Sequence, residues 1–343
     1  MELTAAIIGA GRVGSYHAKG QLALGTKVVV YEPDAERAKA FQEQFSEVTL
    51  ASSLEEAVDM ADVVHVCVPP AHHLEIALLC IERRKPTIIE KPLALNLEEA
   101  VQIYKAVSAA KDVPVILATS FRVGPALPAI YDGVHSGEIG ALTSLETSYV
   151  HDVKNLEPGN TWRKQLEGTA FLYEGGSHGI DLNMWLANEP VSSVQAIVAT
   201  KRVLDEYKWD EDFAISLKYQ DGLVGRVWVS ASAPLPRHGS HIEVYGSMGA
   251  YRVHTKEPYY ESFKDGEHEW QRHPIDVKYT MLTIQTMASI FNDYVQGKRE
   301  DFKPMPDIAD GIRLMVVMDT IEKAIASGKT EPVPSLEEIL SSF

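Results

Sequence analysis

The first third of the chain alternates short apolar runs with longer amphipathic stretches. The apolar runs, which predict strands, are Ala5–Ile8, Thr26–Tyr31, Val48–Leu50, Val63–Val68, Thr87–Ile89 and Val113–Leu117. The stretches between them, which predict helices, cover residues 12–24, 35–45, 54–60, 72–84 and 97–110. Nearly continuous aliphatic strands are typical of a parallel sheet that helices cover on both faces. This region therefore predicts a doubly wound parallel sheet of the Rossmann type.

After about residue 118 the predicted strands become longer, and apolar and polar positions alternate along them. These strands are Thr143–Val150, Val194–Val203, Phe213–Tyr219, Leu223–Ser230, Ile242–Tyr245 and Ala250–His254. Gln220-Asp221-Gly222 and Gly246-Ser247-Met248-Gly249 have the composition of hairpin turns. We expect an open, largely antiparallel sheet whose one face packs against helices near 178–187 and 278–296. A closing helix is expected near 308–327.

Length and composition fit a two-domain globular protein. With 343 residues, the chain is longer than one hydrophobic core usually supports, so we expect an α/β domain over residues 1–118 and an α+β domain over residues 119–343. The formal net charge of −16 argues against nucleic acid or an anionic membrane as the main partner. No apolar stretch approaches the roughly 18 residues that span a bilayer, and Met1-Glu2-Leu3-Thr4 does not resemble a signal peptide. Two isolated cysteines, Cys67 and Cys80, are expected to be buried thiols of a cytoplasmic protein.

The first predicted strand ends in a glycine motif, Gly9-Ala10-Gly11-Arg12-Val13-Gly14, directly before a predicted helix. In this pattern the glycines permit a tight turn, let the backbone approach a pyrophosphate, and let the helix pack close to the strand. An acid, Glu32, ends the second strand eighteen residues after Gly14. Its carboxylate can accept hydrogen bonds from ribose hydroxyls and repel a 2′-phosphate. Because Pro33 follows and no Arg or Lys is adjacent, we expect NAD, with NADP the less favoured alternative.

Two further loops follow strands of the predicted parallel sheet. The fourth strand ends in Val68-Pro69-Pro70, followed by His72 and His73, for which backbone contact or capping is the ordinary role. The fifth strand delivers Glu90-Lys91-Pro92. An ammonium at the carboxyl end of a parallel strand lies in the ligand crevice, and a cis bond before Pro92 would hold it in place.

Together these motifs resemble the Gfo/Idh/MocA oxidoreductase family, which includes glucose–fructose oxidoreductase and inositol dehydrogenases. The resemblance extends over nearly the whole chain. It also includes Gly137-Glu138-Ile139-Gly140, Trp162-Arg163 and the run Glu174-Gly175-Gly176-Ser177-His178-Gly179-Ile180-Asp181-Leu182. It implies that Gly9, Gly11, Arg12, Val13, Gly14, Glu32, Pro69, His73, Glu90 and Lys91 bind the dinucleotide.

The resemblance also implies a catalytic set. In the family a lysine, an acid and a histidine surround the reacting carbon, and the matching positions are Lys91, Glu174 and His178. This chain has Glu174 where the family usually has Asp. The extra methylene of Glu would displace the carboxylate by about one C–C bond length, which puts its role in doubt. Pro70 stands where the family often has Asn, so a side-chain contact from that position is also in doubt.

The residues themselves are consistent with this set. Glu174 and His178 are four positions apart, and Asp181 follows His178 by three, so a helix would place them on one face. Gly175-Gly176 favours a helix that begins near 176–178, with Glu174 in the preceding turn. A histidine beside carboxylates is suited to act as a general base. A metal site is less favoured because no second histidine stands at ligand spacing. The remaining alternative is a purely structural role, in which the segment caps a helix and the histidine is hydrogen-bonded within the fold.

Additional polar and aromatic residues are candidates for substrate contact. Trp162 and Arg163 precede the Glu174 segment, and an aromatic face with a guanidinium can hold a polyol or an acidic group. Arg122, after the sixth strand, is a weaker candidate for the same pocket, alongside Lys91, His178 and Asp181. The ordinary alternative is a core tryptophan and a surface arginine.

We therefore expect an NAD(H)-dependent oxidoreductase acting on a hydroxyl-bearing carbon of a sugar, inositol or related polyol. Two alternatives stay open: a regulatory protein that binds a dinucleotide without catalysis, and an enzyme that uses NAD transiently for elimination or hydrolysis of a sugar. The resemblance further implies a homodimer or homotetramer through the second sheet. The particular substrate and the physiological direction do not follow from the sequence.

Overall fold

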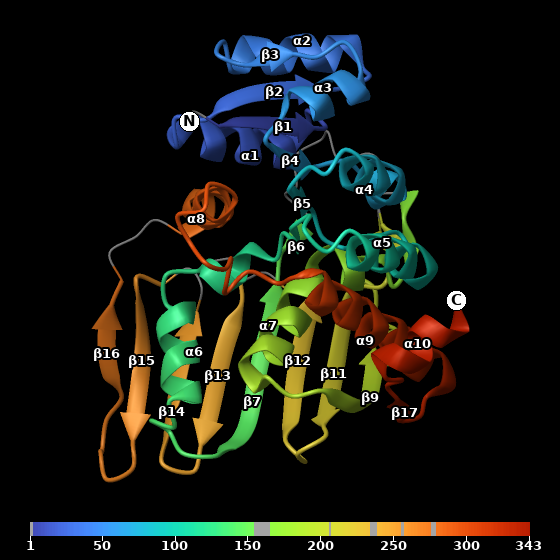
Figure 1. Cartoon of the computed structure of the whole chain (residues 1–343). Coiled ribbons are helices and arrows are strands. Elements are labelled where there is room, and N and C mark those ends of the chain that lie inside the picture. Colours follow the sequence, from blue (N-terminus) through green and yellow to red (C-terminus); the bar gives the residue numbers. More distant parts are fainter. Residues whose placement is uncertain (1–2, 154–164, 206, 234–238, 255–256, 276–278) are drawn as a thin grey trace. The chain divides into compact units, whose positions relative to one another are not determined.

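The computed structural model describes residues 3–343 except 154–164, 206, 234–238, 255–256 and 276–278 (Figure 1). The chain forms two compact units. The N-terminal unit contains Met1–Val123, Thr280–Met315 and Leu340–Phe343, and the C-terminal unit contains Gly124–Tyr279 and Val316–Ile339. The expected single boundary between residues 118 and 119 lies close to the first of these divisions, but the chain also returns to the N-terminal unit after residue 279.

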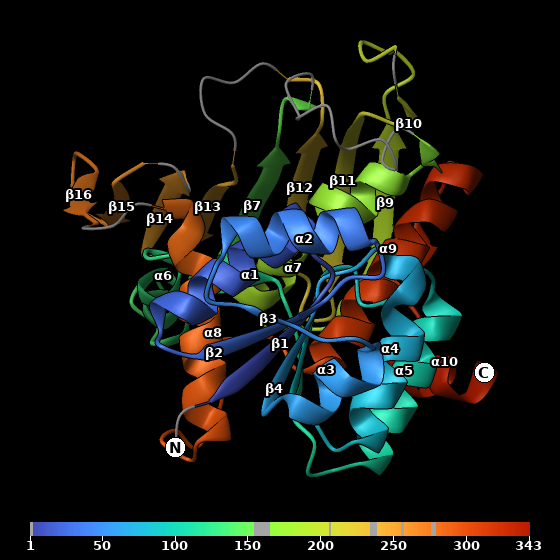
Figure 2. The same cartoon turned by 90° about the horizontal axis from the view of Figure 1, so that it is seen from above.

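The N-terminal unit contains a six-stranded sheet in the order β3-β2-β1-β4-β5-β6, and every strand pair is parallel. Its strands are β1 (Thr4–Ile8), β2 (Lys27–Tyr31), β3 (Thr49–Leu50), β4 (Val63–Val66), β5 (Thr87–Ile89) and β6 (Val115–Leu117). Its helices include α1 (Arg12–Ala23), α2 (Ala35–Gln44), α3 (Leu54–Met60), η1 (Pro70–His72), α4 (His73–Glu82), α5 (Leu97–Ala109) and η2 (Ser120–Val123). The predicted doubly wound parallel sheet is confirmed, with each strand within two residues of its expected bounds (Figures 1 and 2).

The helix N-termini of this unit differ in whether a side chain caps them. Side chains of Asp34, Ser53 and Asn96 accept hydrogen bonds from the first turns of α2, α3 and α5. Such caps satisfy N–H groups that the helix itself leaves without partners. The N-cap of α1 is Gly11, which has no side chain with which to cap. The amino end of α1 therefore keeps N–H groups and a positive dipole end for a ligand.

Helix α8 (Tyr279–Val295) corrects one expectation. Its Met287 and Phe291 are fully buried in a cluster with Val63, Ile88 and Ile116 of the parallel sheet. The prediction that the helix near 278–296 backs the antiparallel sheet is therefore wrong. An amphipathic pattern specifies an apolar face but not the sheet that it covers.

The C-terminal unit contains a nine-stranded mixed sheet in the order β16-β15-β14-β13-β7-β12-β11-β9-β17. Its strands are β7 (Leu142–Val150), β9 (Val191–Val198), β11 (Asp212–Tyr219), β12 (Val224–Ser230), β13 (His241–Gly246), β14 (Gly249–His254), β15 (Tyr259–Lys264), β16 (Gln271–Pro274) and β17 (Glu331–Pro332). Only the pair β7–β12 is parallel among the pairs that the structure describes in this sheet. The predicted open, largely antiparallel sheet is confirmed, as are the hairpins β11–β12 and β13–β14.

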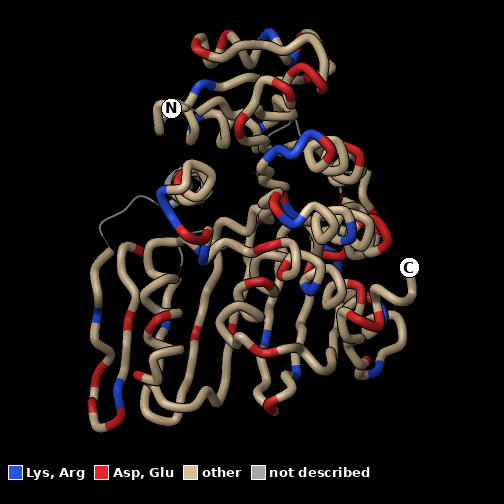
Figure 3. Tube along the Cα trace, in the orientation of Figure 1, with Lys and Arg blue, Asp and Glu red and all other residues tan. Residues whose placement is uncertain are grey.

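The remaining elements are β8 (Glu167–Gly168), β10 (Lys208–Trp209), α6 (Leu127–His135), the π-helical turn η5 (Leu172–Gly176), α7 (Ser177–Ala187), α9 (Ile308–Ser327) and α10 (Leu336–Ser342). Both cysteines are free thiols; Cys80 is buried and Cys67 is half-buried. Within the described part of the chain, we find no helix with the length and apolar character that crossing a membrane requires. The cytoplasmic location stays a prediction. Figure 3 shows basic residues interspersed with acidic ones along the traces of both units.

Candidate active site

The glycine loop between β1 and α1 is shaped by close contacts at two glycines and open at the third. Gly9 has a φ of +104°, and a Cβ there would lie 2.7 Å from the carbonyl oxygen of Cys67. A Cβ on Gly14 would lie 2.0 Å from the carbonyl oxygen of Gly9. A Cβ on Gly11, by contrast, would meet no described atom within 4 Å. Gly11 and Arg12 are exposed and Val13 is half-buried, so the loop presents its backbone as the approach of a pyrophosphate requires.

Glu32 at the end of β2 is tied to this loop. Its carboxylate accepts hydrogen bonds from the backbone N–H of Ala10 at 3.0 Å and of Asp34 at 3.2 Å. The side chain is only 5% exposed, and an Arg37 guanidinium nitrogen lies 3.5 Å from it. Arg37 is not adjacent to Glu32 in the sequence and was therefore not predicted. Its position in the first turn of α2, which begins at Ala35, was the available signal.

His73 connects the loops that follow β4 and β5. Its Nε2 lies 3.0 Å from the carbonyl oxygen of Val68, and its Nδ1 lies 3.0 Å from that of Pro92 and 3.3 Å from that of Leu93. The expected backbone-contact role is therefore confirmed. Burial lowers the pKa of His73 even though these carbonyls and the charge of Glu90 act in the opposite direction. A direct contact of His73 or the exposed Pro69 with the dinucleotide stays a prediction.

Glu90 and Lys91 lie at the carboxyl end of β5, and the Lys91–Pro92 peptide bond is cis as expected. Lys91 is half-buried. The Glu90 Oε1 lies 2.9 Å from His17 Nε2, and the Glu90 side chain is 13% exposed. Burial would raise the pKa of Glu90, but the hydrogen bond from His17 and the charges of His17, Lys91 and His73 outweigh it and lower the pKa. A carboxylate is therefore held ionised next to the proposed catalytic ammonium.

In the C-terminal unit, the π-helical turn η5 carries Glu174 directly before α7. Alpha-helix α7 begins at Ser177, so the expected helix start near 176–178 is confirmed. Glu174 is half-buried, whereas His178 is 9% and Asp181 3% exposed. Single π-helical turns are rare and are often found at functional sites. The predicted acid thus lies in the π-helical turn and the predicted histidine in the first turn of α7.

Three glycines let this segment lie against the sheet. A Cβ on Gly175 would lie 2.3 Å from the Tyr149 ring. Added Cβ atoms on Gly176 and Gly179 would be 3.1 Å from Val229 and 3.2 Å from Val227. These close approaches explain why the segment between Glu174 and His178 consists of small residues.

The Tyr149 ring, at the end of β7, also stacks on the His178 imidazole with centroids 5.5 Å apart and planes inclined by 27°. The rings of Phe171 and His151 are also near it, with centroids 6.1 and 6.2 Å away. Sequence reasoning missed Tyr149, although an aromatic residue at the carboxyl end of the first strand of this sheet was the signal.

A glutamate of α9 anchors the other side of the π-helical turn. Glu322 accepts hydrogen bonds from the hydroxyls of Tyr173, at 2.9 Å, and Thr169. Burial, together with the neighbouring charge of Glu322, raises the pKa of Tyr173, so Tyr173 stays a donor. The backbone that carries Glu174 is therefore fixed from both sides.

The substrate-contact candidates have different outcomes. Arg122 is buried in the N-terminal unit, and its guanidinium nitrogen Nη1 donates to Asp310 of α9 at 3.0 Å. This ion pair gives Arg122 a structural role, and its contact with a substrate stays a prediction. Trp162 and Arg163 lie outside the described residues. Lys91 belongs to the N-terminal unit, and Glu174, His178 and Asp181 belong to the C-terminal unit, so their meeting at one carbon also stays a prediction.

Comparison with known proteins decides the family. Residues 3–118 match the oxidoreductase family's NAD-binding Rossmann fold, and residues 132–334 match its C-terminal alpha/beta domain. The chain belongs to the Gfo/Idh/MocA oxidoreductase family. Its N-terminal unit is accordingly the NAD-binding domain of a family oxidoreductase.

Relatives within this family include several dehydrogenases. The levoglucosan dehydrogenase of Pseudarthrobacter phenanthrenivorans is 23% identical over 97% of this chain and 99% of the relative. The inositol 2-dehydrogenase of Rhizobium meliloti is 22% identical over 93% of this chain and 96% of the relative.

Solved structures share the fold over almost the whole chain. A levoglucosan dehydrogenase in complex with NADH and levoglucosan has a TM-score of 0.85 at 22% identity, covering 98% of this chain and 100% of the other. An oxidoreductase from Agrobacterium radiobacter in complex with NAD+, L-tartaric acid and magnesium has a TM-score of 0.84 at 19% identity, covering 97% and 99%.

Proposed function

We propose that this family member transfers a hydride between NAD and a secondary hydroxyl or ketone carbon of a sugar, inositol or related polyol. The observation that carries the proposal is Lys91, an ammonium at the carboxyl end of β5 in an NAD-binding domain. Ligands of such sheets bind outside the carboxyl ends of their strands. The substrate class is supported by the relatives, which include a levoglucosan dehydrogenase and an inositol 2-dehydrogenase.

Three side chains divide the acid–base work. When bound, NAD supplies the hydride acceptor or donor. Lys91 donates a hydrogen bond to the substrate oxygen and stabilises negative charge there. His178 takes the hydroxyl proton during oxidation and returns it during reduction. Glu174 orients His178 and favours its protonated form.

The dinucleotide site fits NAD better than NADP. The amino end of α1 and the open space at Gly11 suit a pyrophosphate, and the Glu32 carboxylate suits unmodified ribose hydroxyls. The Glu32 charge would repel a 2′-phosphate, whereas Arg37 would attract one. We expect the carboxylate to dominate, because it is nearly buried while Arg37 is 57% exposed and therefore screened.

Further contacts would hold the polyol. Asp181, which lies one turn after His178 on α7, is proposed as one of them. Trp162 and Arg163 are proposed to offer an aromatic face and a guanidinium, and Arg122 stays a weaker candidate because Asp310 already pairs with it.

The decisive experiment compares Lys91→Met with unmodified protein. Purified protein is screened with sugars, inositols and their acid or phosphate derivatives, with NAD and NADP side by side, and NADH formation is followed by absorbance. We expect turnover of at least one polyol, and a loss of about a hundredfold or more in Lys91→Met with nearly unchanged NAD binding. Lys105→Met, which alters an exposed lysine of α5, is the matched control.

Other results would replace the proposal. Turnover that persists in Lys91→Met would remove this lysine from the reaction. Binding of NAD without NADH formation across the whole panel would favour a regulatory protein. Cofactor that co-purifies and does not exchange during turnover would favour transient use of NAD in elimination or hydrolysis.

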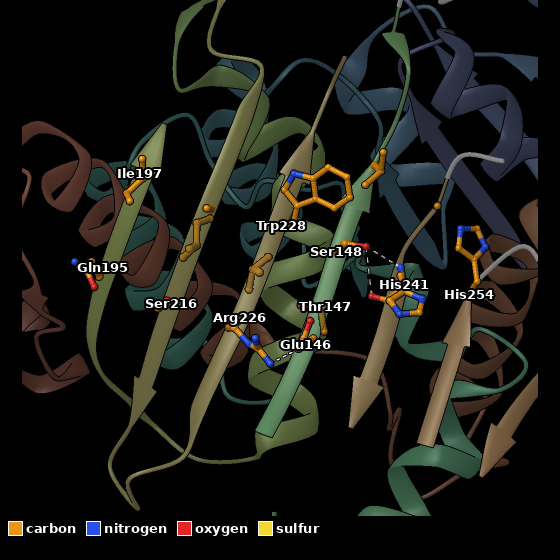
Figure 4. A pocket seen from close by; sticks show the side chains of 15 residues that line it. Glu146, Thr147, Ser148, Gln195, Ile197, Ser216, Arg226, Trp228, His241 and His254 are labelled. Carbon is orange, nitrogen blue, oxygen red and sulfur yellow. Dashed lines mark hydrogen bonds and ion pairs between the residues drawn. The ribbon is translucent and has the colours of Figure 1, made fainter. Parts of the chain in front are cut away.

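We also propose that a second copy of the chain covers the open face of the nine-stranded sheet. Figure 4 shows a hollow on this face with Trp228 at its centre. Trp228 is 46% and Ile197 67% exposed, although the side chains on the same strands that alternate with them are mostly buried. Exposed apolar side chains around a hollow are typical of an interface. The expected assembly is a homodimer or homotetramer.

Light scattering after size-exclusion chromatography tests this assembly. We expect Trp228→Glu to shift the mass toward that of one chain. Met248→Glu changes an exposed apolar residue at the β13–β14 hairpin of the same sheet and serves as control. A single-chain mass for the unmodified protein would contradict the proposal.

A further inference from the structure

A buried chain of polar side chains lies behind Glu90 in the N-terminal unit. His17 Nε2 is 2.9 Å from Glu90 Oε1, and His17 Nδ1 is 2.7 Å from His65 Nδ1. His65 Nε2 is 2.7 Å from the amide nitrogen of Gln21, which pairs with the carboxamide of Asn292 at 2.8 and 3.2 Å. We call these five residues the His17 network.

Four different parts of the fold build this network. His17 and Gln21 stand one turn apart on α1, and His65 lies within β4. Glu90 directly follows β5, and Asn292 lies on α8. His17, Gln21 and His65 are completely buried, and Asn292 is 6% exposed. Burying so many polar groups is unfavourable unless each one has a partner, and a fully connected network is also rigid. The network is therefore a specific feature rather than an incidental contact.

The groups at the two ends determine where the protons lie. An ionised Glu90 only accepts, so His17 carries a proton on Nε2. At the other end the Gln21 amide donates to His65 Nε2, so His65 carries its proton on Nδ1 and directs it at His17 Nδ1. The ring of His65 is neutral in this arrangement. Burial, followed by the proximity of His17, lowers the pKa of His65 well below its usual range and agrees with a neutral ring.

The far end of the network does not conduct protons. The carboxamides of Gln21 and Asn292 do not titrate, so a proton that reached His65 could not leave through them. Their paired hydrogen bonds instead fix the orientation of the Gln21 amide. The network therefore holds Glu90 in place and does not serve as a path for protons.

Glu90 faces charged and titratable groups from four elements. These are His17 of α1, Lys91 of its own loop and His73 of α4, together with Cys67 beyond β4, whose pKa is raised by burial and by the charge of Glu90. The hydrogen bond from His17 is the largest of the effects that lower the pKa of Glu90. Without it, the pKa of Glu90 would rise, because burial favours the protonated carboxyl.

We infer that His17 and His65 are positioning residues for Lys91. They hold the Glu90 carboxylate ionised and in one orientation, and through it they fix the place of the ammonium beside it. This inference rests on the role proposed above for Lys91 in hydride transfer. It adds two residues that touch neither substrate nor cofactor.

Nuclear magnetic resonance of protein labelled with 15N in its histidines tests the proton arrangement without any substrate. Signals are assigned with His17→Phe and His65→Gln. We expect a proton on Nε2 of His17, and a neutral His65 with its proton on Nδ1 that stays unchanged from about pH 8 to about pH 5. A charged His65, or one protonated on Nε2 alone, would overturn the inference. The unmodified protein provides this spectrum even if a variant fails to fold.

Kinetics with the active polyol and NAD test the consequence for Lys91. We expect His17→Phe to lower kcat by about tenfold to hundredfold, as displaced catalytic groups do, with KM for NAD within about twofold. The acid limb of the pH profile of kcat should move to higher pH in His17→Phe, because Glu90 loses the donor that lowers its pKa. His17→Gln keeps a donor toward Glu90 and should recover most of kcat. The control His72→Gln, at an exposed histidine paired with Glu75, should match the unmodified protein.

The outcomes separate the inference from the proposed function. If Lys91→Met abolishes turnover while His17→Phe changes neither kcat nor the acid limb, only the positioning role is refuted. Equal losses in His17→Phe and His17→Gln with an unchanged pH profile would indicate a merely structural role and also refute it. If Lys91→Met retains turnover, the proposed function fails, whatever the tautomers of His17 and His65.

Discussion

The imidazole of His65 lies in the middle of β4, completely buried, with its Nε2 2.7 Å from the carboxamide nitrogen of Gln21. The amide donates, so the ring nitrogen that faces it must keep a lone pair. Burial of the ring and this contact both make protonation of His65 unfavourable in the folded protein. It also gives the N-terminal unit a specific dependence of stability on pH.

Acidification should destabilise the protein through His65. The folded pKa of His65 lies well below its ordinary value of 6.5, so below pH 6.5 the unfolded chain binds a proton that the folded chain refuses. Stability therefore falls as the pH falls, by about 1.4 kcal/mol per pH unit for one proton. Urea unfolding followed by far-ultraviolet circular dichroism measures the unfolding free energy between about pH 6.5 and 4.5. Its slope against pH should be flatter by about that amount in His65→Gln than in the unmodified protein. An unchanged slope in His65→Gln, or an equal change in His72→Gln, would contradict the prediction.

Two glycines of the same loop should respond differently to alanine. Gly14→Ala places a Cβ 2.0 Å from the Gly9 carbonyl oxygen, so we expect a loss of about 1–3 kcal/mol in unfolding free energy together with loss of NAD binding. Gly11→Ala meets no described atom within 4 Å and should keep its Tm within a few degrees while its methyl group obstructs the pyrophosphate. Thermal unfolding and NADH fluorescence titration measure the two effects. Full NAD affinity in Gly11→Ala would show that the dinucleotide does not approach this backbone.

Glu32 should decide between NAD and NADP. Glu32→Gln keeps a hydrogen-bond acceptor but removes the negative charge, so Arg37 becomes free to attract a 2′-phosphate. We expect the ratio of kcat/KM for NAD to that for NADP to fall by about tenfold, which corresponds to about 1.4 kcal/mol.

Arg37→Ala provides the comparison for Glu32→Gln. It should lower kcat/KM for NADP below that of the unmodified protein without weakening the binding of NAD. A preference unchanged in both variants would place the discrimination elsewhere in the loop.

Tyr149 should support His178 through its ring and not through its hydroxyl. The two rings are stacked with centroids 5.5 Å apart, and such aromatic contacts contribute about 0.5–1.5 kcal/mol. Tyr149→Leu should therefore lower kcat by about threefold to tenfold with little change in the Kd of NAD, whereas Tyr149→Phe should retain activity. Steady-state kinetics and cofactor titration check both variants. Equal losses in the two variants would assign the effect to the hydroxyl instead.

Much of the fold could be predicted because its information is local. Periods of hydrophobicity near 2 and 3.6 mark strands and helices wherever the chain lies, and the bounds of β5 and α9 agree with the structure residue for residue. The strands β8, β10, β15, β16 and β17 were not predicted, and three of them consist of two residues, which are too few to show a period. The placement of α8 was predicted wrongly, because Met287 and Phe291 specify an apolar face but not the sheet beneath it.

The candidate site could be predicted only where its chemistry is contained in a contiguous motif. The glycine loop, the Lys91–Pro92 turn and the Glu174–His178 segment each lie within a few residues. The contacts of Arg37 with Glu32 and of Tyr149 with His178 do not, because they join different elements of a folded unit.

The sequence by itself determined the two kinds of sheet, the dinucleotide loop and which side chains can exchange protons, because periodicity and motif spacing are properties of neighbouring residues. Only the tertiary structure decided which sheet α8 covers and which partners complete the polar groups of the interior. His17 and Glu90 are 73 positions apart, and their hydrogen bond exists only because α1 packs over the sheet that carries both β4 and β5. A buried polar group depends on what the fold places beside it, and that is a property of the packed chain as a whole.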